Sequence, residues 1–514
     1  MTVGERSRHL LAWSVGAAVL FACYLGLSRT VPVNSDGASI ALQAWDMLHG
    51  NPLLHGWWLS DVSFYTTELP QYALLELAFG LHSDVVHVAG AMTYTLMVLL
   101  AAMLAKGRER GTAGTGRALI AAGIMLAPQL GGGALVLLLS PDHVGSTVPV
   151  LAAFLIVDRG PRRWYVPASV AALLTWSLVA DRVVLVTGVL PLAAVCLARG
   201  YRGAVHQRRP WGSQWYELSL GAAALTSVAL ASLVEAVLEA QGGYQLGPFG
   251  AVSVLSVPQI PGVLYSDAQA VLLLFGADFL ARPTGLLTGM ALVHLAGVSL
   301  AGWAVWIGAR RLPREPDLVS ASLVAAVLIN GAAYVLLIQG HDVLAAREMA
   351  AILPFSAALA GRLLGPRLAT PRLRPLAAVL LAGYLACLGY AVAQPPAPAA
   401  DQRLATWLAA RHLRSGLAGY WQASGTTLAS GGRIQVSPVC VTRDRVSVEH
   451  WESKAIWYDP RWREARFLIL GGQADCYYVT AAQARSAFGP PARSYHVGPY
   501  TVLVWSRNLL ATVR

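Results

Sequence analysis

Long apolar runs dominate this chain and constrain its fold more than any other feature of the sequence. A helix that crosses a bilayer needs about 20 apolar residues, and eleven segments of the 514-residue chain approach that length, the fourth to the sixth being short. Only 13% of the residues are charged, against about 25% in a soluble domain. We therefore expect a polytopic membrane protein. The predicted spans are 10–27, 85–104, 118–139, 144–157, 166–180, 183–198, 218–238, 285–309, 318–338, 348–364 and 376–393.

Basic residues predict the orientation of these spans, because cytoplasmic loops are enriched in Lys and Arg. With the N-terminus inside, the inner loops hold 20 of the 24 basic residues before position 394. An odd number of spans then places the C-terminus outside. The run 10–27 has no clear small-residue cleavage site, so we expect an uncleaved first span. The four outer basic residues are Arg29, Arg182, Arg282 and Arg347.

The net charge of +11 follows from these inner loops and does not indicate a nucleic-acid partner. Of the 38 basic residues 36 are Arg, and Ala, Leu and Gly are abundant. This bias suggests a bacterial genome of high GC content, and hence a bacterial plasma membrane.

Three regions differ from simple spans. The outer loop 28–84 contains a helix-like stretch, 38–48, and several Trp residues of the kind found at membrane interfaces. The region 239–284 is rich in Gly and Pro, which favours a re-entrant or surface-lying segment. The third region, 394–514, follows a Pro-rich linker, and such linkers separate domains.

The third region is predicted to mix helix and strand. We expect a helix over 401–414 and strands at 433–441, 467–470, 476–480 and 500–505. The predicted fold is therefore mainly α: a helical membrane bundle of about eleven spans over 1–393, N-terminus in and C-terminus out, followed by a small extracytoplasmic α/β domain over 394–514.

Several chemical classes lack support in the sequence. A Gly-rich phosphate loop, GxSxG and HExxH are all absent, which argues against a nucleotide-driven pump and a serine hydrolase. Four His residues lie in or just after the first outer loop, but their spacing matches no metal motif. A divalent metal therefore remains an alternative without a motif behind it.

Ionisable residues gather at the predicted outer ends of the spans. Such groups cost roughly 2.5–3.5 kcal/mol each at mid-bilayer on insertion scales, and they persist where they face a polar cavity. Several loops supply them, so we expect a shared cavity. These residues are Asp36, Asp61, Glu68, Asp142, His143, Asp181, Arg182, His341, Asp342, Arg347 and Glu348.

Most of these residues also have a structural interpretation, and for His341-Asp342 it is solvation of an outer loop. Asp36 is a candidate general base, but a carboxylate at this position is also a candidate helix N-cap. Asp142-His143 is equally consistent with a cap or an interfacial pair, and Asp181-Arg182 with a turn. Arg347-Glu348 is consistent with a structural ion pair, and Glu68 with a solvent-facing position.

These elements resemble the GT-C superfamily of membrane glycosyltransferases, which includes protein O-mannosyltransferases and lipid A aminoarabinose transferases. The resemblance covers about 1–393 by architecture. Members often carry an Asp-Glu pair in the first loop, whereas here Gly37 follows Asp36, so a second carboxylate must come from elsewhere, such as Asp61 or Glu68. The matching motifs are Asn34-Ser35-Asp36-Gly37, Ala41-Leu42-Gln43-Ala44-Trp45, Ser140-Pro141-Asp142-His143-Val144-Gly145, Ala180-Asp181-Arg182, Leu274-Phe275-Gly276-Ala277-Asp278-Phe279 and Arg347-Glu348.

The resemblance implies a reaction on the outer face of the membrane. The donor would be a polyprenyl-phosphate-linked sugar, and the acceptor a hydroxyl of a glycan, lipid or protein that attacks with inversion. Asp36 would take the hydroxyl proton, and Arg347 and Arg182 would bind the donor phosphate. Asp61, Glu68, Asp142, His143, Asp181 and Glu348 are the other active-site candidates.

Two alternatives to an enzyme remain. A transporter or flippase is disfavoured because the charges lie at span ends and no repeat is visible. A non-catalytic scaffold that displays the C-terminal domain leaves the outer polar groups unexplained. Separately, Cys440 and Cys476 lie on the predicted outer side, where a disulfide between them is permitted, the alternative being two buried free thiols.

Overall fold

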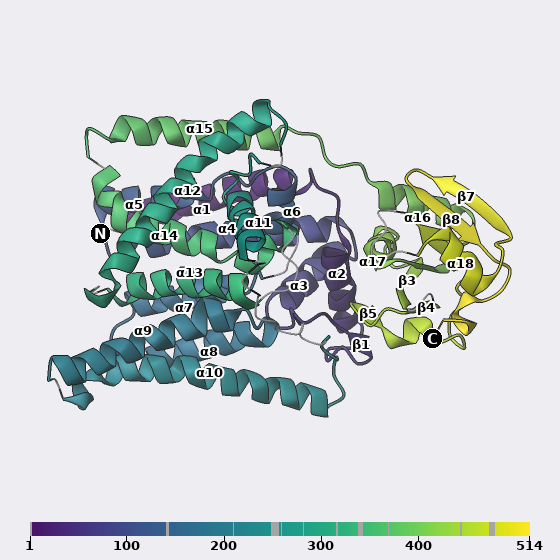
Figure 1. The fold of residues 1–514 in the computed structure, drawn as a ribbon, viewed down its shortest axis with the longest axis horizontal. Coiled ribbons are helices and arrows are strands. Elements are labelled where there is room, and N and C mark those ends of the chain that lie inside the picture. Colours follow the sequence, from purple (N-terminus) through teal and green to yellow (C-terminus); the bar gives the residue numbers. More distant parts are fainter. Residues whose placement is uncertain are drawn as a thin grey trace. The chain divides into compact units, whose positions relative to one another are not determined.

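The structure is a computed structural model of the chain. It describes residues 3–139, 143–208, 210–247, 256, 258, 260–280, 282–314, 317–337, 343–368, 370–442, 445–471 and 479–513. The chain forms two compact units. The first, here called the membrane unit, contains Met1–Val31, Gly90–Val234 and Gly250–Pro396, and the second, called the α/β unit, contains Pro32–Ala89, Glu235–Phe249 and Ala397–Arg514. Figure 1 labels the elements of both.

The membrane unit is a bundle of apolar helices. Among the described residues, eight helices are long and apolar enough to cross a membrane, so the chain is a polytopic membrane protein. They coincide with eight of the eleven predicted spans. Their bounds are Leu11–Ser28, Asp84–Lys106, Leu185–His206, Gly212–Ala240, Leu286–Arg311, Leu318–Leu336, Ala345–Leu368 and Arg374–Val392.

The bundle consists of α-helices with one π-helix and one 3₁₀ helix among them. They are α1 (Val3–Ser28), α4 (Asp84–Lys106), α5 (Gly111–Ile124), α6 (Gly132–Leu138), α7 (Thr147–Arg159), α8 (Tyr165–Ala180), the π-helix η1 (Leu185–Val189), α9 (Leu190–Tyr201), α10 (Trp215–Ala240), α11 (Ile260–Leu274), α12 (Leu286–Arg311), α13 (Leu318–Leu337), the 3₁₀ helix η6 (Val343–Met349), α14 (Ile352–Leu368) and α15 (Arg374–Val392).

The predicted span 118–139 is not one continuous helix. Helix α5 ends at Ile124 and α6 begins at Gly132. Pro128 disfavours helical geometry in the residue before it, and Gly131 has a φ of 79°, a left-handed conformation that glycine adopts without strain. The predicted fourth and fifth spans are the short helices α7 and α8, so the total of eleven spans stays a prediction.

A buried ion cluster joins three helices at one end of the membrane unit. Arg362 of α14 donates to Asp158 of α7 at 2.8 Å and to Asp317, just before α13, at 2.7 Å. Arg362 also donates to the carbonyl of Leu104 in α4 at 2.6 Å. These contacts give Arg362, which the sequence places in an inner loop, a structural role.

The α/β unit contains a six-stranded sheet in the order β4-β3-β2-β6-β8-β7. The central strand β2 runs parallel to β3 and to β6, and the remaining pairs are antiparallel. Its core includes Leu404, Val436, Phe467 and Val502. The elements are α16 (Ala400–Ala410), β2 (Ser415–Ala418), α17 (Tyr420–Ala429), β3 (Gln435–Thr442), β4 (Arg445–Val448), β6 (Phe467–Leu470), α18 (Ala481–Phe488), β7 (Arg493–Val497) and β8 (Tyr500–Val504).

The predicted first helix and three of the predicted strands of this region are present as α16, β3, β6 and β8. Most of the predicted strand 476–480 lies outside the described residues, and its described part, 479–480, is not a strand. Helix α17 and strand β2 had no counterpart in the sequence-based prediction.

The first outer loop belongs to this same unit. It folds into α2 (Ser35–Leu48), β1 (Trp57–Trp58) and α3 (Glu68–Phe79), which confirms the predicted helix in 38–48. Strand β1 pairs with β5 (Ser453–Lys454), with Trp57 opposite Lys454. The last part of the unit begins at Ala397, close to the predicted boundary, but the sequence analysis assigned the first loop to the membrane domain.

Candidate functional site

The carboxylate of Asp36 is held at the start of helix α2. Asn34 is the N-cap of this helix, and its side chain accepts from the Gly37 amide at 3.0 Å. Asp36 is thus in the first turn and is not the cap, which corrects the structural alternative given for it above. A carboxylate in the first turn is stabilised by the helix dipole, and Asn34 Nδ2 donates to Asp36 Oδ2 at 3.1 Å.

A second donor to Asp36 comes from the C-terminal part of the chain. The hydroxyl of Tyr420 in α17 donates to Asp36 Oδ1 at 2.6 Å. The neighbouring Ser35 hydroxyl donates to the backbone oxygen of Tyr420, also at 2.6 Å. Asp36 itself is only half-buried, whereas Tyr420 is 3% exposed. The carboxylate is therefore held by Tyr420 and Asn34 and remains partly exposed at the surface of the unit.

The other two carboxylates of the first loop occupy different settings. Asp61 is half-buried in the segment between β1 and α3. Glu68 begins α3 and is buried, and the hydroxyl of Thr67 donates to its Oε2. The burial of Glu68 does not fit the solvent-facing alternative.

Three of the predicted site residues meet in the membrane unit. His143 Nδ1 lies 2.9 Å from Asp181 Oδ2, and His143 Nε2 lies 3.0 Å from Glu348 Oε2. Ser146 donates to Asp181 Oδ2 at 2.7 Å, and the Val183 amide donates to Asp181 Oδ1 at 2.9 Å. We call His143, Asp181 and Glu348 the histidine cluster. It joins the turn before α7, the end of α8 and η6.

Charge favours the imidazolium in this cluster. Burial alone would disfavour it, but Asp181 and Glu348 more than offset that effect and hold the pKa of His143 well above its ordinary value. Burial likewise opposes ionisation of Asp181, yet His143 and the donors around Asp181 hold the pKa of that carboxyl below its ordinary value. The imidazolium therefore stabilises each carboxylate, and both carboxylates stabilise the imidazolium.

The two predicted phosphate-binding arginines each adjoin a member of this cluster. Arg182 is exposed and follows Asp181, and Arg347 is half-buried and precedes Glu348. The cluster thus brings together two predicted outer loops that carry arginines. Asp142, His341 and Asp342 lie outside the described residues.

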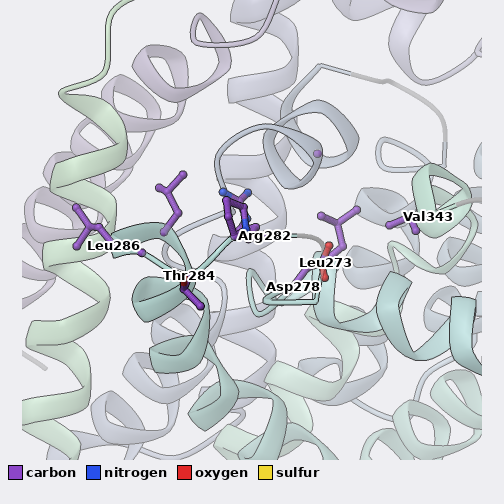
Figure 2. A pocket seen from close by; sticks show the side chains of 10 residues that line it. Leu273, Asp278, Arg282, Thr284, Leu286 and Val343 are labelled. Carbon is purple, nitrogen blue, oxygen red and sulfur yellow. The ribbon is translucent and has the colours of Figure 1, made fainter.

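The membrane unit also contains a cavity of about 620 Å³, which lies at the ends of α6, α11 and α12. Figure 2 shows Arg282 and Asp278 on its wall, with apolar side chains around them. Val343, the first residue of η6, lines it, and Arg347 is one helical turn further along the same element. The lining residues are Gly132, Leu273, Asp278, Arg282, Pro283, Thr284, Gly285, Leu286, Leu287 and Val343.

The break between α5 and α6 positions the charged wall of this cavity. Gln129 donates to the backbone oxygen of Asp278 at 2.8 Å, and Arg282 Nη2 donates to the backbone oxygen of Leu130 at 2.5 Å. Gly276 has a φ of 77°, and a Cβ there would lie 2.9 Å from the ring of His294. Only glycine therefore allows the loop to approach this closely.

Two residues of these sites were not singled out from the sequence. Arg282 is one of only four basic residues on the predicted outer side, and that scarcity is a signal for it. Tyr420 had none, because its partner Asp36 lies 384 positions away.

The structure does not test the cysteine and metal predictions. Cys440 is a free thiol, with its Sγ 3.6 Å from the Val448 oxygen. Cys476 lies outside the described residues, so the predicted bridge stays a prediction. Within the part of the chain that the structure describes, no group of three or more His, Cys, Asp or Glu is arranged to hold a metal ion.

Comparison with known proteins finds similar structures but no similar sequence family. No family model matches the chain, and no curated protein matches its sequence. The structure is similar to the crystal structure of ArnT from Cupriavidus metallidurans bound to undecaprenyl phosphate, with a TM-score of 0.58 and 11% identity over 97% of this chain and 98% of ArnT. An oligosaccharyltransferase from Archaeoglobus fulgidus tethered with an acceptor peptide matches with a TM-score of 0.48 and 11% identity, over 89% of this chain and 69% of that one. The chain therefore shares the fold of ArnT over nearly its whole length.

Proposed function

We propose that this protein is a membrane glycosyltransferase that moves a sugar from a polyprenyl-phosphate donor to an acceptor hydroxyl, with Asp36 as the general base. The placement of Asp36 carries the proposal: a half-buried carboxylate in the first turn of α2, oriented by Tyr420 and Asn34. The fold supports it, because ArnT, which shares that fold, was crystallised with undecaprenyl phosphate.

The carboxylate suits proton abstraction. An ionised carboxylate acts only as a hydrogen-bond acceptor and can take up a proton at an oxygen. The acceptor oxygen forms a bond to the anomeric carbon while its proton passes to Asp36. The bond between that carbon and the phosphate oxygen breaks, and its electron pair leaves with the polyprenyl phosphate. Attack opposite the leaving group inverts the anomeric centre.

The leaving phosphate gains negative charge and needs cations more than it needs an acid. Arg347 and Arg182 remain our candidates for this role, because both adjoin the histidine cluster. Arg282 is a third candidate, since it lines a cavity whose other walls include Leu273, Leu286 and Leu287. The guanidinium group matches phosphate oxygens with paired donors, and the leucines offer an apolar surface for a prenyl chain.

The reaction draws its energy from the activated donor. This accounts for an enzyme without a nucleotide-binding motif in its sequence. On the predicted orientation the reaction takes place on the outer side of a bacterial plasma membrane. The acceptor is a hydroxyl of a glycan, a lipid or a protein.

The test is sugar transfer by the purified full-length protein in nanodiscs. The donors are radiolabelled sugars on undecaprenyl phosphate, and delipidated cell-envelope material and water serve as acceptors. We expect the wild type to consume at least one donor, and Asp36→Asn to lose about 10²- to 10⁴-fold in rate. Glu464→Gln is the matched control, because it removes an exposed carboxylate of the same unit.

Two outcomes contradict the proposal. Full activity of a folded Asp36→Asn variant would move the base to another carboxylate, such as Asp61 or Glu68. Binding of undecaprenyl phosphate without consumption of any donor, together with movement of the lipid across the bilayer, would favour a flippase.

A further inference from the structure

We propose that Tyr420 is a positioning residue for Asp36, so that the C-terminal part of the chain completes the catalytic site. The inference rests on the proposed function of Asp36 and goes beyond it, because it gives the C-terminal region a part in the reaction. Tyr420 contacts the proposed base and acts through it.

The contact between the two segments has two points. The Tyr420 hydroxyl donates to Asp36 Oδ1 at 2.6 Å, and the Tyr420 backbone oxygen accepts from Ser35 at 2.6 Å. Asn34 Nδ2 approaches the other carboxylate oxygen at 3.1 Å. A side-chain contact alone would leave α17 free to turn. The backbone contact to the residue before Asp36 fixes both the distance and the direction of the phenol.

Tyr420 directly follows the central strand of the sheet, and this strand determines its position. Strand β2 ends at Ala418, Gly419 follows in an extended conformation, and α17 begins at Tyr420. Strand β2 has parallel neighbours on both sides, β3 and β6. In open α/β sheets the carboxyl ends of such strands are where functional groups collect.

The helix that carries Tyr420 is itself firmly anchored. The Thr427 hydroxyl of α17 accepts from the Val436 amide of β3 at 3.0 Å, and the Ser430 hydroxyl just after α17 accepts from the Ile434 amide at 2.9 Å. Ala423 of α17 belongs to the core of the sheet. A rigid support of this kind is what a precisely oriented catalytic group requires.

The hydrogen bond from Tyr420 to Asp36 suits a carboxylate that acts as a base. A phenol that donates to a carboxylate favours the ionised form, and only that form accepts the acceptor's proton. The same hydrogen bond fixes the orientation of the carboxylate. Loss of the hydroxyl should therefore slow the chemical step and weaken the ionised state, without a direct effect on donor binding.

The test is Tyr420→Phe in the full-length protein in nanodiscs, since Phe keeps the ring and loses only the hydroxyl. We expect kcat to fall roughly 10- to 100-fold with little change in the KM for the donor. We also expect the acidic limb of the kcat–pH profile to move to higher pH. An unchanged kcat and an unchanged profile would reduce Tyr420 to a packing residue.

Tyr500→Phe is the matched control. Tyr500 donates to a carboxylate oxygen of Asp401 in the same unit, also at 2.6 Å. This variant loses the same kind of hydrogen bond, so it shows what that loss does to folding. Its pH profile should match that of the wild type. An equal shift in both profiles would overturn the proposal.

A double variant guards against a trivial loss of folding. If Tyr420 acts through Asp36, then Tyr420→Phe should not slow the residual reaction of Asp36→Asn any further. An equal slowing in both backgrounds would show that Tyr420 acts independently of Asp36, and the proposal would fail. Full activity of the Asp36→Asn protein would instead refute the role of Asp36 as the base, so the two failures are distinguishable.

Discussion

His143 Nε2 lies 3.0 Å from Glu348 Oε2, although the two residues belong to predicted outer loops that are far apart in the chain. Asp181 completes the cluster from a third loop. The arrangement fixes three loops around one imidazole, so loss of the His143 side chain should lower the stability of the whole membrane unit.

His143→Leu should destabilise the protein by about 3–5 kcal/mol, because it leaves the carboxylate of Asp181 buried without its cationic partner. The Asp181 side chain is 3% exposed, so water cannot replace the lost contact. Thermal unfolding in detergent measures the effect. His206→Leu is the control, since His206 is exposed. Equal melting temperatures for the two variants would show that the cluster does not stabilise the fold.

The same cluster predicts how stability varies with pH. The pKa of His143 is raised in the folded state, so its contribution is complete below the unfolded pKa of about 6.5. That contribution is lost as the pH rises through the raised pKa. The pKa of Asp181 is lowered on folding, so its contribution is present above about pH 3.9 and lost in acid.

The melting temperature of the wild type should therefore be highest between about pH 4 and pH 6.5 and fall on both sides. His143→Gln should flatten the fall on the alkaline side, because the neutral amide does not titrate. Thermal unfolding in a buffer series measures both curves. A His143→Gln curve parallel to the wild type above pH 6.5 would assign the alkaline fall to another group.

Arg282→Gln should raise the KM for the lipid-linked donor roughly 10- to 100-fold, as expected for one charge-assisted hydrogen bond to phosphate. Arg282→Lys should recover part of the loss, since a lysine keeps the charge but lacks the planar pair of donors. Steady-state kinetics with varied donor concentration measures the effect. Arg372→Gln, an exposed loop residue of the same unit, should behave like the wild type. A wild-type KM for Arg282→Gln would leave Arg347 and Arg182 as the phosphate ligands.

The sequence was informative wherever a property is local. Apolar length alone located the eight long helices, because the bilayer thickness sets that length. Apolar length gave a wrong result between α5 and α6, because the apolar run continues through Pro128 and Gly131, where the helix is interrupted. The gathering of ionisable residues at the predicted outer span ends drew attention to His143, Asp181 and Glu348. The structure brings these three side chains together, and their part in a reaction stays a prediction.

Long-range pairing was out of reach of a single sequence. Helix α17 is short and contains Gly, Ser and Thr, residues of modest or poor helix propensity, so its pattern did not stand out. Its role follows from the contact of Tyr420 with Asp36, which no local rule predicts. The inclusion of the first loop in the α/β unit is of the same kind, because it depends on the pairing of β1 with β5.

The carboxylate of Asp46 in α2 holds the first loop to the C-terminal part of the α/β unit. Its Oδ2 accepts from Asn51 at 2.6 Å, from Trp57 Nε1 at 2.7 Å and from Lys454 Nζ at 2.8 Å. Asp46→Ala removes one acceptor and leaves three donors unsatisfied, one of them charged. We expect a loss of about 2–3 kcal/mol in stability and faster cleavage of the region by trypsin.

Asp459→Ala is the control for this last prediction, because Asp459 pairs with Arg461 at the surface and water replaces that contact readily. Thermal unfolding and timed trypsin digestion of the purified protein should separate the two variants. Since α2 also carries Asp36, Asp46→Ala should lower transfer activity in proportion to the fraction unfolded. A fully stable Asp46→Ala protein would mean that the sheet pair β1–β5 and the contact of Tyr420 with α2 suffice to hold the loop.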